Sequence, residues 1–376
     1  MAEALQPLLR VSGLSRAFGG VQAVDDVGFE LAAGEMLALI GPNGAGKSTT
    51  FNMVGGQLRP DAGQVLLGGV DITGLPPRTI WRHGVGRTFQ IAETFASLTV
   101  LENVQMALLS ADRSIYRFWR PAGQHRRADA LALLEQVGMA AQAERPCSAL
   151  AYGDIKRVEL ALALAHAPRL LLMDEPLAAL DAPRKAEILP YLERLHRELA
   201  LPIVYVTHAM DEVARLADHL VLLEAGRVRA AGPLAELLAR PDLPLARQDE
   251  AGVVISARVD QHDHAYGLSR VAFDGGTLWV GETAAAPGEA VRARVLARDV
   301  SVARQRPQDT SVLNVLPVVL DSLQADRSTA LLRLRLGSAD AGPVWLLARI
   351  TRRSAETLAL QPGDALFAQV KGVALM

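Results

Sequence analysis

The sequence is poor in cysteine and in lysine. Cys147 is its only cysteine, so no internal disulfide can form and the fold must stand without covalent cross-links, as in cytosolic proteins. We expect this thiol to be a small core residue. Only four lysines are present among 39 basic residues, and 41 acidic residues bring the net charge to -2. A strongly charged partner is therefore not implied.

The sequence also lacks a long hydrophobic run. Its most apolar segment, residues 158–173, is interrupted by His166, Pro168 and Arg169, well short of the roughly 20 apolar residues of a membrane span. The first residues have neither a basic region nor a long apolar core, unlike a secretion signal. We expect a soluble protein, and 376 residues suffice for two or three globular domains.

One glycine-rich segment carries a strong signal. Residues 37–56 read as a short apolar strand, then the pattern G-x-x-x-x-G-K-S, then a helix. Gly41, Gly44 and Gly46 would let backbone N–H groups surround a β-phosphate at the helix N-terminus. Lys47 would reach the β and γ oxygens, and Ser48 would offer a hydroxyl to magnesium. This pattern predicts a nucleotide-binding loop rather than a chance glycine turn.

Three further segments end in residues that suit phosphate chemistry. The apolar run 170–173 leads into Asp174 and Glu175, as a buried strand delivering acids to a sheet edge would. Asp174 then suits the magnesium shell, and Glu175 suits a general base that polarises water. His208 ends another apolar run and could contact the γ-phosphate, although a lone histidine there is more often structural. Gln90 could orient water or magnesium.

Together these residues resemble the ATPase subunit of ABC transporters over about residues 8–240. That family has an α/β P-loop NTPase fold with a helical subdomain, expected here at about 91–160, and binds ATP with Mg2+ between the subunits of a head-to-tail dimer. The resemblance implies that Phe18 stacks on adenine, although a core phenylalanine is the alternative. The nucleotide contacts that it implies are Phe18, Gly41, Asn43, Gly44, Gly46, Lys47, Ser48, Thr49, Ala151 and Gly153.

The signature segment departs from the usual L-S-G-G-Q of the family. It reads L-A-Y-G-D from Leu150 to Asp154, which removes a serine hydroxyl but keeps Gly153 and the N-terminus of the following helix. This variant resembles the ATPases of branched-chain amino acid importers, as does the rest of about 8–173. After Pro176 the chain instead resembles the molybdate importer ATPase. The sequence thus looks like a composite joined near that proline.

The segment between Gln90 and the signature is expected to be helical. Thr99 and Glu102 form a candidate capping box, and residues 126–138 have helical apolar spacing that ends at Gly138. In the family this subdomain and the glutamine loop receive a helix of the membrane permease. The cluster at 116–120 could join that surface or simply pack locally.

The carboxyl-terminal third has a different composition. We place the end of the ATPase domain at 240, a linker at 241–252, and an all-β, OB-like domain at 253–376. The segment from Pro287 is repeated from Pro362, which indicates two barrel-like repeats at about 253–307 and 308–376. Asp274 and the glycines after it predict a hairpin. Residues 252–376 carry 14 basic and 12 acidic residues, so nucleic acid is not an expected partner.

The second repeat resembles the molybdate-binding domain of molybdate importer ATPases. A tetrahedral dianion needs hydroxyls, N–H groups and a cation, and such sites form between subunits in that family. The alternative is a dimerisation module that binds nothing. His262 and His264 are read as exposed turn residues rather than a metal site. The candidate oxyanion ligands are Ser311, Asn314, Arg353, Ser354 and Lys371.

These features predict the peripheral ATPase of an ABC importer at the cytoplasmic face of the inner membrane. Molybdate or tungstate is the expected cargo, and a branched-chain amino acid is the alternative. The resemblance implies a homodimer or paired ATPase subunit, an integral membrane permease and, indirectly, a periplasmic substrate-binding protein. Glu175, His208 and Gln90 are the predicted catalytic residues, and Ser48, Gln90 and Asp174 the predicted magnesium ligands. A non-transport ABC ATPase and a pure oxyanion-binding protein are the rival classes.

Overall fold

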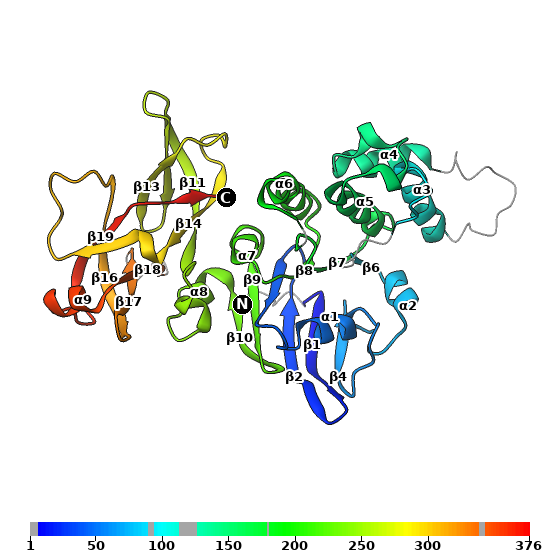
Figure 1. Ribbon diagram of the computed structural model, residues 1–376, viewed down its shortest axis with the longest axis horizontal. Coiled ribbons are helices and arrows are strands. Elements are labelled where there is room, and N and C mark those ends of the chain that lie inside the picture. Colours follow the sequence, from blue (N-terminus) through cyan, green and yellow to red (C-terminus); the bar gives the residue numbers. More distant parts are fainter. Residues whose placement is uncertain (1–6, 89–93, 113–125, 179, 338–342) are drawn as a thin grey trace, which may run out of the picture. The chain divides into compact units, whose positions relative to one another are not determined.

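The chain folds into two compact units, Met1–Ala231 and Gly232–Met376. The computed structural model describes residues 7–88, 94–112, 126–178, 180–337 and 343–376 (Figure 1). The division lies earlier than the boundary predicted at residue 240. Helix α8 (Leu234–Leu238) packs against strand β11 (Gly252–Asp263), and Leu245 and Ala246 are buried. Because these apolar side chains need a core, residues 232–252 fold with the second unit instead of forming a linker.

The first unit contains a six-stranded sheet in the order β10-β9-β3-β8-β7-β6. Strands β3, β6, β7, β8 and β9 pair in parallel and are mostly buried, which explains their continuous apolar sequences. The carboxyl ends of β3, β7 and β8 meet at one edge of the sheet, so the loops that follow them come together. The strands are β3 (Met36–Ile40), β6 (Val85–Arg87), β7 (Leu170–Asp174), β8 (Ile203–Val206), β9 (His219–Glu224) and β10 (Arg227–Pro233).

The same unit also contains an antiparallel sheet in the order β2-β1-β4-β5. Helix α1 (Lys47–Val54) buries Phe51 in a core shared by both sheets, with Leu14 of β1 and Leu172 of β7. The helix is therefore fixed at its apolar side while its N-terminus follows the glycine-rich loop. The strands are β1 (Leu9–Phe18), β2 (Val21–Leu31), β4 (Ala62–Leu67) and β5 (Val70–Asp71), and the short helix α2 (Pro77–Arg82) follows them.

Helices α3 (Val100–Ala111), α4 (Arg127–Gln136) and α5 (Tyr152–Leu164) lie together in Figure 1. The capping box predicted at the start of α3 is confirmed: Thr99 Oγ1 accepts the Glu102 N–H at 3.1 Å, and Glu102 Oε2 accepts the Thr99 N–H at 2.8 Å. Cys147 is buried in the same core, as expected. Helices α6 (Ala182–Leu199) and α7 (Met210–Leu216) follow β7 and β8.

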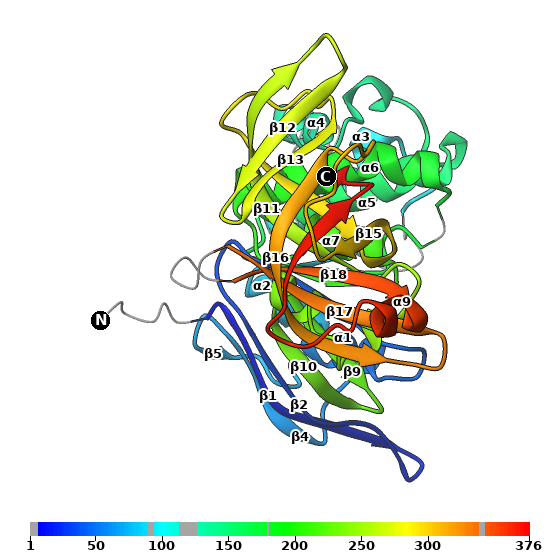
Figure 2. The ribbon, with the colours of Figure 1, turned by 90° about the vertical axis from the view of Figure 1, so that its left-hand side faces the viewer.

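The second unit consists of two five-stranded sheets (Figure 2). Its sheets exchange their edges: β15, from the first predicted repeat, pairs with β19, while β20, the last strand, pairs with β14. The repeat boundary at 307/308 therefore does not separate the sheets, because each covers an edge of the other. One sheet has β11, β12 (Leu268–Phe273), β13 (Gly276–Gly281), β14 (Ala290–Leu296) and β20 (Ala374–Leu375); the other has β15 (Val300–Ala303), β16 (Asn314–Ala325), β17 (Thr329–Leu336), β18 (Val344–Thr351) and β19 (Ala365–Val370).

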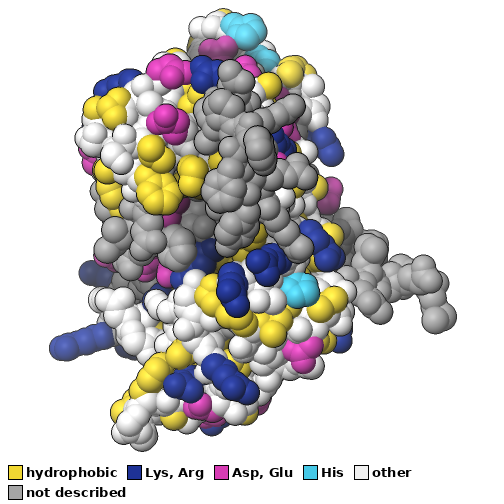
Figure 3. Space-filling model, turned by 90° about the vertical axis from the view of Figure 1, so that its right-hand side faces the viewer, with side chains coloured by type: hydrophobic (Ala, Val, Ile, Leu, Met, Phe, Trp, Pro, Cys, Tyr) yellow, Lys and Arg dark blue, Asp and Glu magenta, His cyan; other side chains and the backbone are white. Residues whose placement is uncertain are grey.

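The hairpin predicted at Asp274 joins β12 to β13, where Phe273 pairs with Gly276. Helix α9 (Arg352–Thr357) follows β18. Among the described residues, we find no helix with both the length and the apolar character needed to cross a bilayer. Figure 3 shows one face of the molecule, where the described surface carries basic and acidic side chains interspersed with apolar ones.

Candidate nucleotide site

Three glycines shape the loop that follows β3. Gly41, Gly44 and Gly46 have φ values of 151°, 81° and 94°, which side chains rarely adopt. A Cβ atom on Gly41 would lie 2.3 Å from the carbonyl oxygen of Leu223, and one on Gly46 would lie 2.6 Å from that of Ala23. A Cβ on Gly44 would meet no described atom within 4 Å. Two of the glycines thus permit close backbone approach, and the third faces open space.

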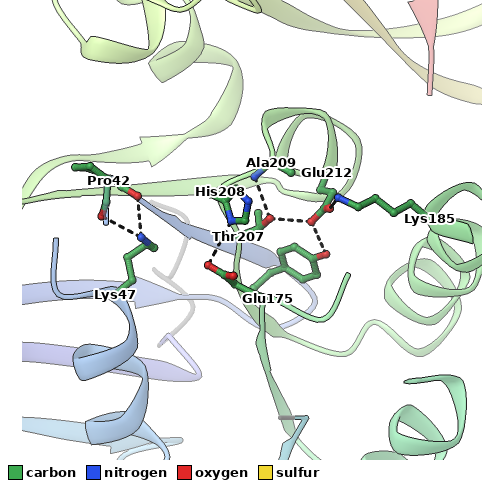
Figure 4. A network of polar contacts seen from close by, with 10 residues as sticks. Pro42, Lys47, Glu175, Lys185, Thr207, His208, Ala209 and Glu212 are labelled. Atoms are coloured by element: carbon green, nitrogen blue, oxygen red, sulfur yellow. Dashed lines mark hydrogen bonds and ion pairs between the residues drawn. The ribbon is translucent and has the colours of Figure 1, made fainter. Parts of the chain in front are cut away.

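Helix α1 begins directly after this loop. Its N-cap, Gly46, offers no side-chain acceptor, so the first N–H groups of the helix are left for an anion. Lys47 is only 7% exposed, and its Nζ donates to the carbonyl oxygens of Gly41 and Pro42 at 2.8 and 3.1 Å. The loop therefore holds the Lys47 ammonium group against two of its own carbonyl oxygens (Figure 4). Asn43 and Ser48 are exposed beside it, and Thr49 is half-buried.

Asp174 and Glu175 lie at the carboxyl end of β7. Burial raises the pKa of the Asp174 carboxyl, while the nearby Arg87 guanidinium opposes that rise. Glu175 has a φ of 43°, a conformation that is costly for a residue other than glycine, and its N–H donates to Val206 O at 2.9 Å. The neighbouring strand thus holds a strained backbone at the position that carries the predicted base.

His208, after β8, faces Glu175. The distance from His208 Nδ1 to Glu175 Oε1 is 3.4 Å, and the histidine side chain is 64% exposed. Figure 4 shows Lys47, Glu175 and His208 approaching one another from three different segments of the sequence. The structure thus brings together the phosphate loop and two of the predicted catalytic residues. Gln90, the third, lies outside the described residues.

Phe18 lies at the end of β1 and is 46% exposed, with the Arg16 guanidinium 5.2 Å from its ring centroid. An exposed ring face suits stacking on a base and excludes the alternative of a core phenylalanine. At the signature segment, Ala151 is the exposed N-cap of α5, and Gly153 is buried in the first turn of the helix. This segment therefore exposes the N-terminus of α5 to a ligand, and not the buried Gly153.

One basic residue close to this edge of the sheet was not predicted from the sequence. Arg87, the last residue of β6, lies 4.5 Å from the Phe51 ring centroid and donates to Asn52 Oδ1 at 2.8 Å. Its charge acts on Asp174, which lies one strand away. The signal that the sequence offered for Arg87 was its place at the end of a buried strand, β6, which runs parallel to the strand that ends in Asp174.

The five candidate oxyanion ligands do not gather within one chain. Asn314 begins β16 opposite Val370, next to Lys371, whereas Ser354 lies on α9, beyond the β18 end that pairs with Thr329. The register of β16 and β17 places Thr329 near the far end of β16, so the two groups flank opposite ends of the sheet. Ser311 and Arg353 are exposed.

The side chain of Asn314 is already engaged. Its Oδ1 accepts the Trp279 N–H at 2.7 Å, and its Nδ2 donates to Trp279 O at 2.9 Å. Ser354 Oγ lies 2.7 Å from Thr351 Oγ1, which caps α9. His264 is an exposed turn residue, as predicted, and pairs with Glu282, whereas the same prediction was wrong for His262, a half-buried residue of β11 whose Nδ1 lies 2.8 Å from Ser269 Oγ.

Comparison with known proteins agrees with this arrangement. Residues 24–178 match the ABC transporter family, and residues 310–376 match the TOBE domain. The chain is 46% identical over 355 residues to the Molybdenum import ATP-binding protein ModC of Albidiferax ferrireducens, covering 93% of this chain and 92% of that protein. The protein of the same name from Pseudomonas aeruginosa is 44% identical, covering 96% and 97%.

Solved structures match the first unit. An ATP-binding cassette of an ABC transporter in its ADP conformation has a TM-score of 0.55 and 29% identity, covering 61% of this chain and 91% of its own. A dimeric cassette in a post-hydrolysis state, bound to ADP and Pi, has a TM-score of 0.52 and 28% identity, covering 60% and 98%. The chain therefore belongs to the ABC transporter ATPase family, with a TOBE domain at its carboxyl end.

Proposed function

We propose that this chain is the ATP-hydrolysing subunit of an ABC importer that takes up molybdate or tungstate through a separate permease. One observation supports molybdenum oxyanions as the cargo. The similarity to proteins named for molybdenum import extends over 93% of the chain, so it includes both units and not only the ATPase. The site described above supplies the chemistry.

The phosphates of ATP would bind at the N-terminus of α1, where backbone N–H groups and Lys47 converge. Ser48 and Asp174 would hold Mg2+, with Gln90 as the further ligand predicted from the sequence. Asp174 fits that role, because burial raises the pKa of its carboxyl despite the nearby Arg87, and a bound cation would favour the charged carboxylate there. When bound, the magnesium ion neutralises charge on the β and γ phosphates.

Hydrolysis would use Glu175 as the general base. A water molecule attacks the γ-phosphorus, its oxygen forms the new P–O bond, its proton passes to the Glu175 carboxylate, and the bond to the bridging oxygen of ADP breaks. His208 would donate a hydrogen bond to a γ-phosphate oxygen from its exposed position 3.4 Å from Glu175. Phe18 would stack on the adenine.

The second ATP-binding surface would come from another copy of this chain or a paired ATPase subunit. The start of α5, at Ala151, is exposed and has no described side-chain cap, as a surface that receives the opposite γ-phosphate requires. Dimeric cassettes occur among the similar solved structures.

The permease would dock near the helices of the first unit. A hollow of about 320 Å³ lies between α2 and α5, lined by Trp81, Leu162 and Ala163 among others. A largely apolar hollow of this size suits the apolar side chains of a short amphipathic helix of a membrane partner. The chain would then sit at the cytoplasmic face of the inner membrane and meet the periplasmic substrate-binding protein only through the permease.

A branched-chain amino acid is the second candidate cargo. The predicted likeness of Leu150–Asp154 and the rest of residues 8–173 to amino acid importer ATPases favours it, whereas relatives named for molybdenum import cover 93% of the chain. In that case the second unit would sense an oxyanion or serve dimerisation only.

The test compares the purified wild-type chain with Glu175→Gln in ATP binding and phosphate release. We expect the variant to keep its ATP affinity and to lose steady-state turnover by about 100-fold or more, the usual contribution of a general base. Glu30→Gln, which makes the same change on exposed β2, serves as the control and should match wild type. Full turnover in Glu175→Gln would refute the assignment.

A further inference from the structure

A buried carboxylate lies beside the nucleotide site and has no part in the chemistry above. Glu212, in the first turn of α7, is 1% exposed. Its Oε1 accepts from Lys185 Nζ at 2.7 Å, and its Oε2 accepts the hydroxyl protons of Tyr205 and Thr207 at 2.9 and 2.8 Å. A buried charge persists only where donors compensate the lost hydration, and three donors do so here. Figure 4 shows this network on the side of His208 that faces away from Lys47.

Thr207 transmits this constraint to His208. Its hydroxyl proton points to Glu212, which leaves the oxygen to accept the Ala209 N–H at 3.1 Å. The donor lies two residues beyond the acceptor, so the closed ring of atoms spans His208. Because the histidine side chain is mostly exposed, little packing orients it. Its position therefore depends on this backbone turn and on the contact with Glu175.

Tyr205 connects the same carboxylate to the central sheet. It is buried on β8 opposite Met173 of β7, the residue before Asp174. Burial, together with the charge of Glu212, raises the pKa of the Tyr205 hydroxyl well above its ordinary value, so the group remains a proton donor.

Lys185 connects Glu212 to a different element. It lies in the first turn of α6, whose N-cap is Asp181, the end of the loop that follows Glu175. Its backbone N–H donates to Asp181 O at 2.9 Å, and its side chain is 22% exposed. The Lys185–Glu212 ion pair thus joins the loop after one catalytic residue to the turn that carries the other.

We propose that Glu212 is a positioning residue for ATP hydrolysis, which fixes the His208 turn and ties it through Lys185 to the start of α6. The proposal rests on the hydrolytic function proposed above. Because Glu212 is buried and its carboxylate faces Lys185, Tyr205 and Thr207, it acts on the rate only through where it holds His208 relative to Glu175. Its loss should therefore lower kcat and leave ATP affinity nearly unchanged.

The experiment replaces Glu212 with glutamine in the full chain and measures kcat, KM for ATP and the ATP dissociation constant. Glutamine keeps the shape, but its NH2 group must face either the Lys185 ammonium or the two hydroxyl protons, so one side of the network breaks. Because displacing a catalytic group by about 1 Å costs on the order of 100-fold in rate, we expect kcat to fall about 10- to 100-fold. The ATP dissociation constant should stay within about threefold, as expected when an interaction is lost mainly in the transition state.

Two further variants keep the test decisive. Glu193→Gln breaks another ion pair between α6 and α7, the one between Glu193 and Arg215. This pair does not include the Thr207 hydroxyl, so the variant should keep kcat within about twofold of wild type. Lys185→Met removes only the connection to α6 and leaves the Tyr205 and Thr207 hydroxyls to compensate the Glu212 charge, so it serves if Glu212→Gln fails to fold; kcat should fall again, with ATP affinity kept.

Equal kcat values for wild type, Lys185→Met and Glu212→Gln would overturn the proposal. It would also be overturned if Glu193→Gln lost as much activity as Glu212→Gln, since the effect would then be general to the contact of the two helices. An inactive wild-type chain is a separate result, because it would refute the proposed ATPase function itself and this proposal with it.

Discussion

Replacing Asn314 with alanine tests whether this residue joins the two sheets of the second unit. The side chain is 8% exposed, and both of its polar atoms bond to the backbone of Trp279, at 2.7 and 2.9 Å. Each net hydrogen bond contributes about 1 kcal/mol, and leaving a buried partner unsatisfied costs about 1 to 3 kcal/mol. We therefore expect the second unit to lose about 2 to 4 kcal/mol of unfolding free energy.

Urea unfolding followed by tryptophan fluorescence measures this loss, because Trp279 and Trp345 report on the second unit. Ser311→Ala is the matched control, since Ser311 is exposed and should change stability by less than about 0.5 kcal/mol. Asn314→Asp should destabilise as well, because a carboxylate oxygen would replace the donor that faces Trp279 O. If Asn314→Ala lowered the unfolding free energy by less than about 0.5 kcal/mol, the structural role would be refuted. Asn314 would then again be a candidate oxyanion ligand.

Three other predictions follow from the same structure. Gly41→Ala should abolish ATP binding in an equilibrium titration while Gly44→Ala binds more nearly as wild type, because the added Cβ meets Leu223 O at 2.3 Å only in the first; equal binding would contradict the reading of the loop. Burial lowers the pKa of His166 to about 4, so the unfolded chain binds the proton more readily and stability should fall as pH drops from about 6.5 to 4. His166→Phe should flatten that slope in urea midpoints measured across the range, and an unchanged slope would contradict it. Calorimetry should show molybdate binding to the full chain with no heat for sulfate; no heat for either anion would make the second unit a dimerisation module.

Much of the nucleotide site could be predicted because its residues obey local rules. Gly41 and Gly46 are fixed by backbone conformation, and Asp174, Glu175 and His208 follow apolar strands whose parallel pairing brings their ends together. Each of these residues stands in a local pattern, a glycine-rich loop or the end of an apolar run, so it is visible in the sequence even though the strands pair over long separations.

Other features depend on tertiary contacts and could not be predicted in this way. Lys185 and Glu212 belong to different helices, and nothing in either local sequence indicates that they pair. Asn314 was assigned to an anion because its side chain can donate, yet its partner is the backbone of Trp279 in another sheet. The exchange of β15 and β20 between sheets was hidden for the same reason.

The central claim is that ATP hydrolysis by this chain drives molybdate uptake. The most direct measurement is uptake of radiolabelled molybdate by cells in which this chain is the only ATPase available to its permease, with leucine uptake measured in parallel. We expect the wild-type chain to restore molybdate uptake and Glu175→Gln to fail to restore it. Restored leucine uptake without molybdate uptake, or full molybdate uptake with Glu175→Gln, would contradict the central claim.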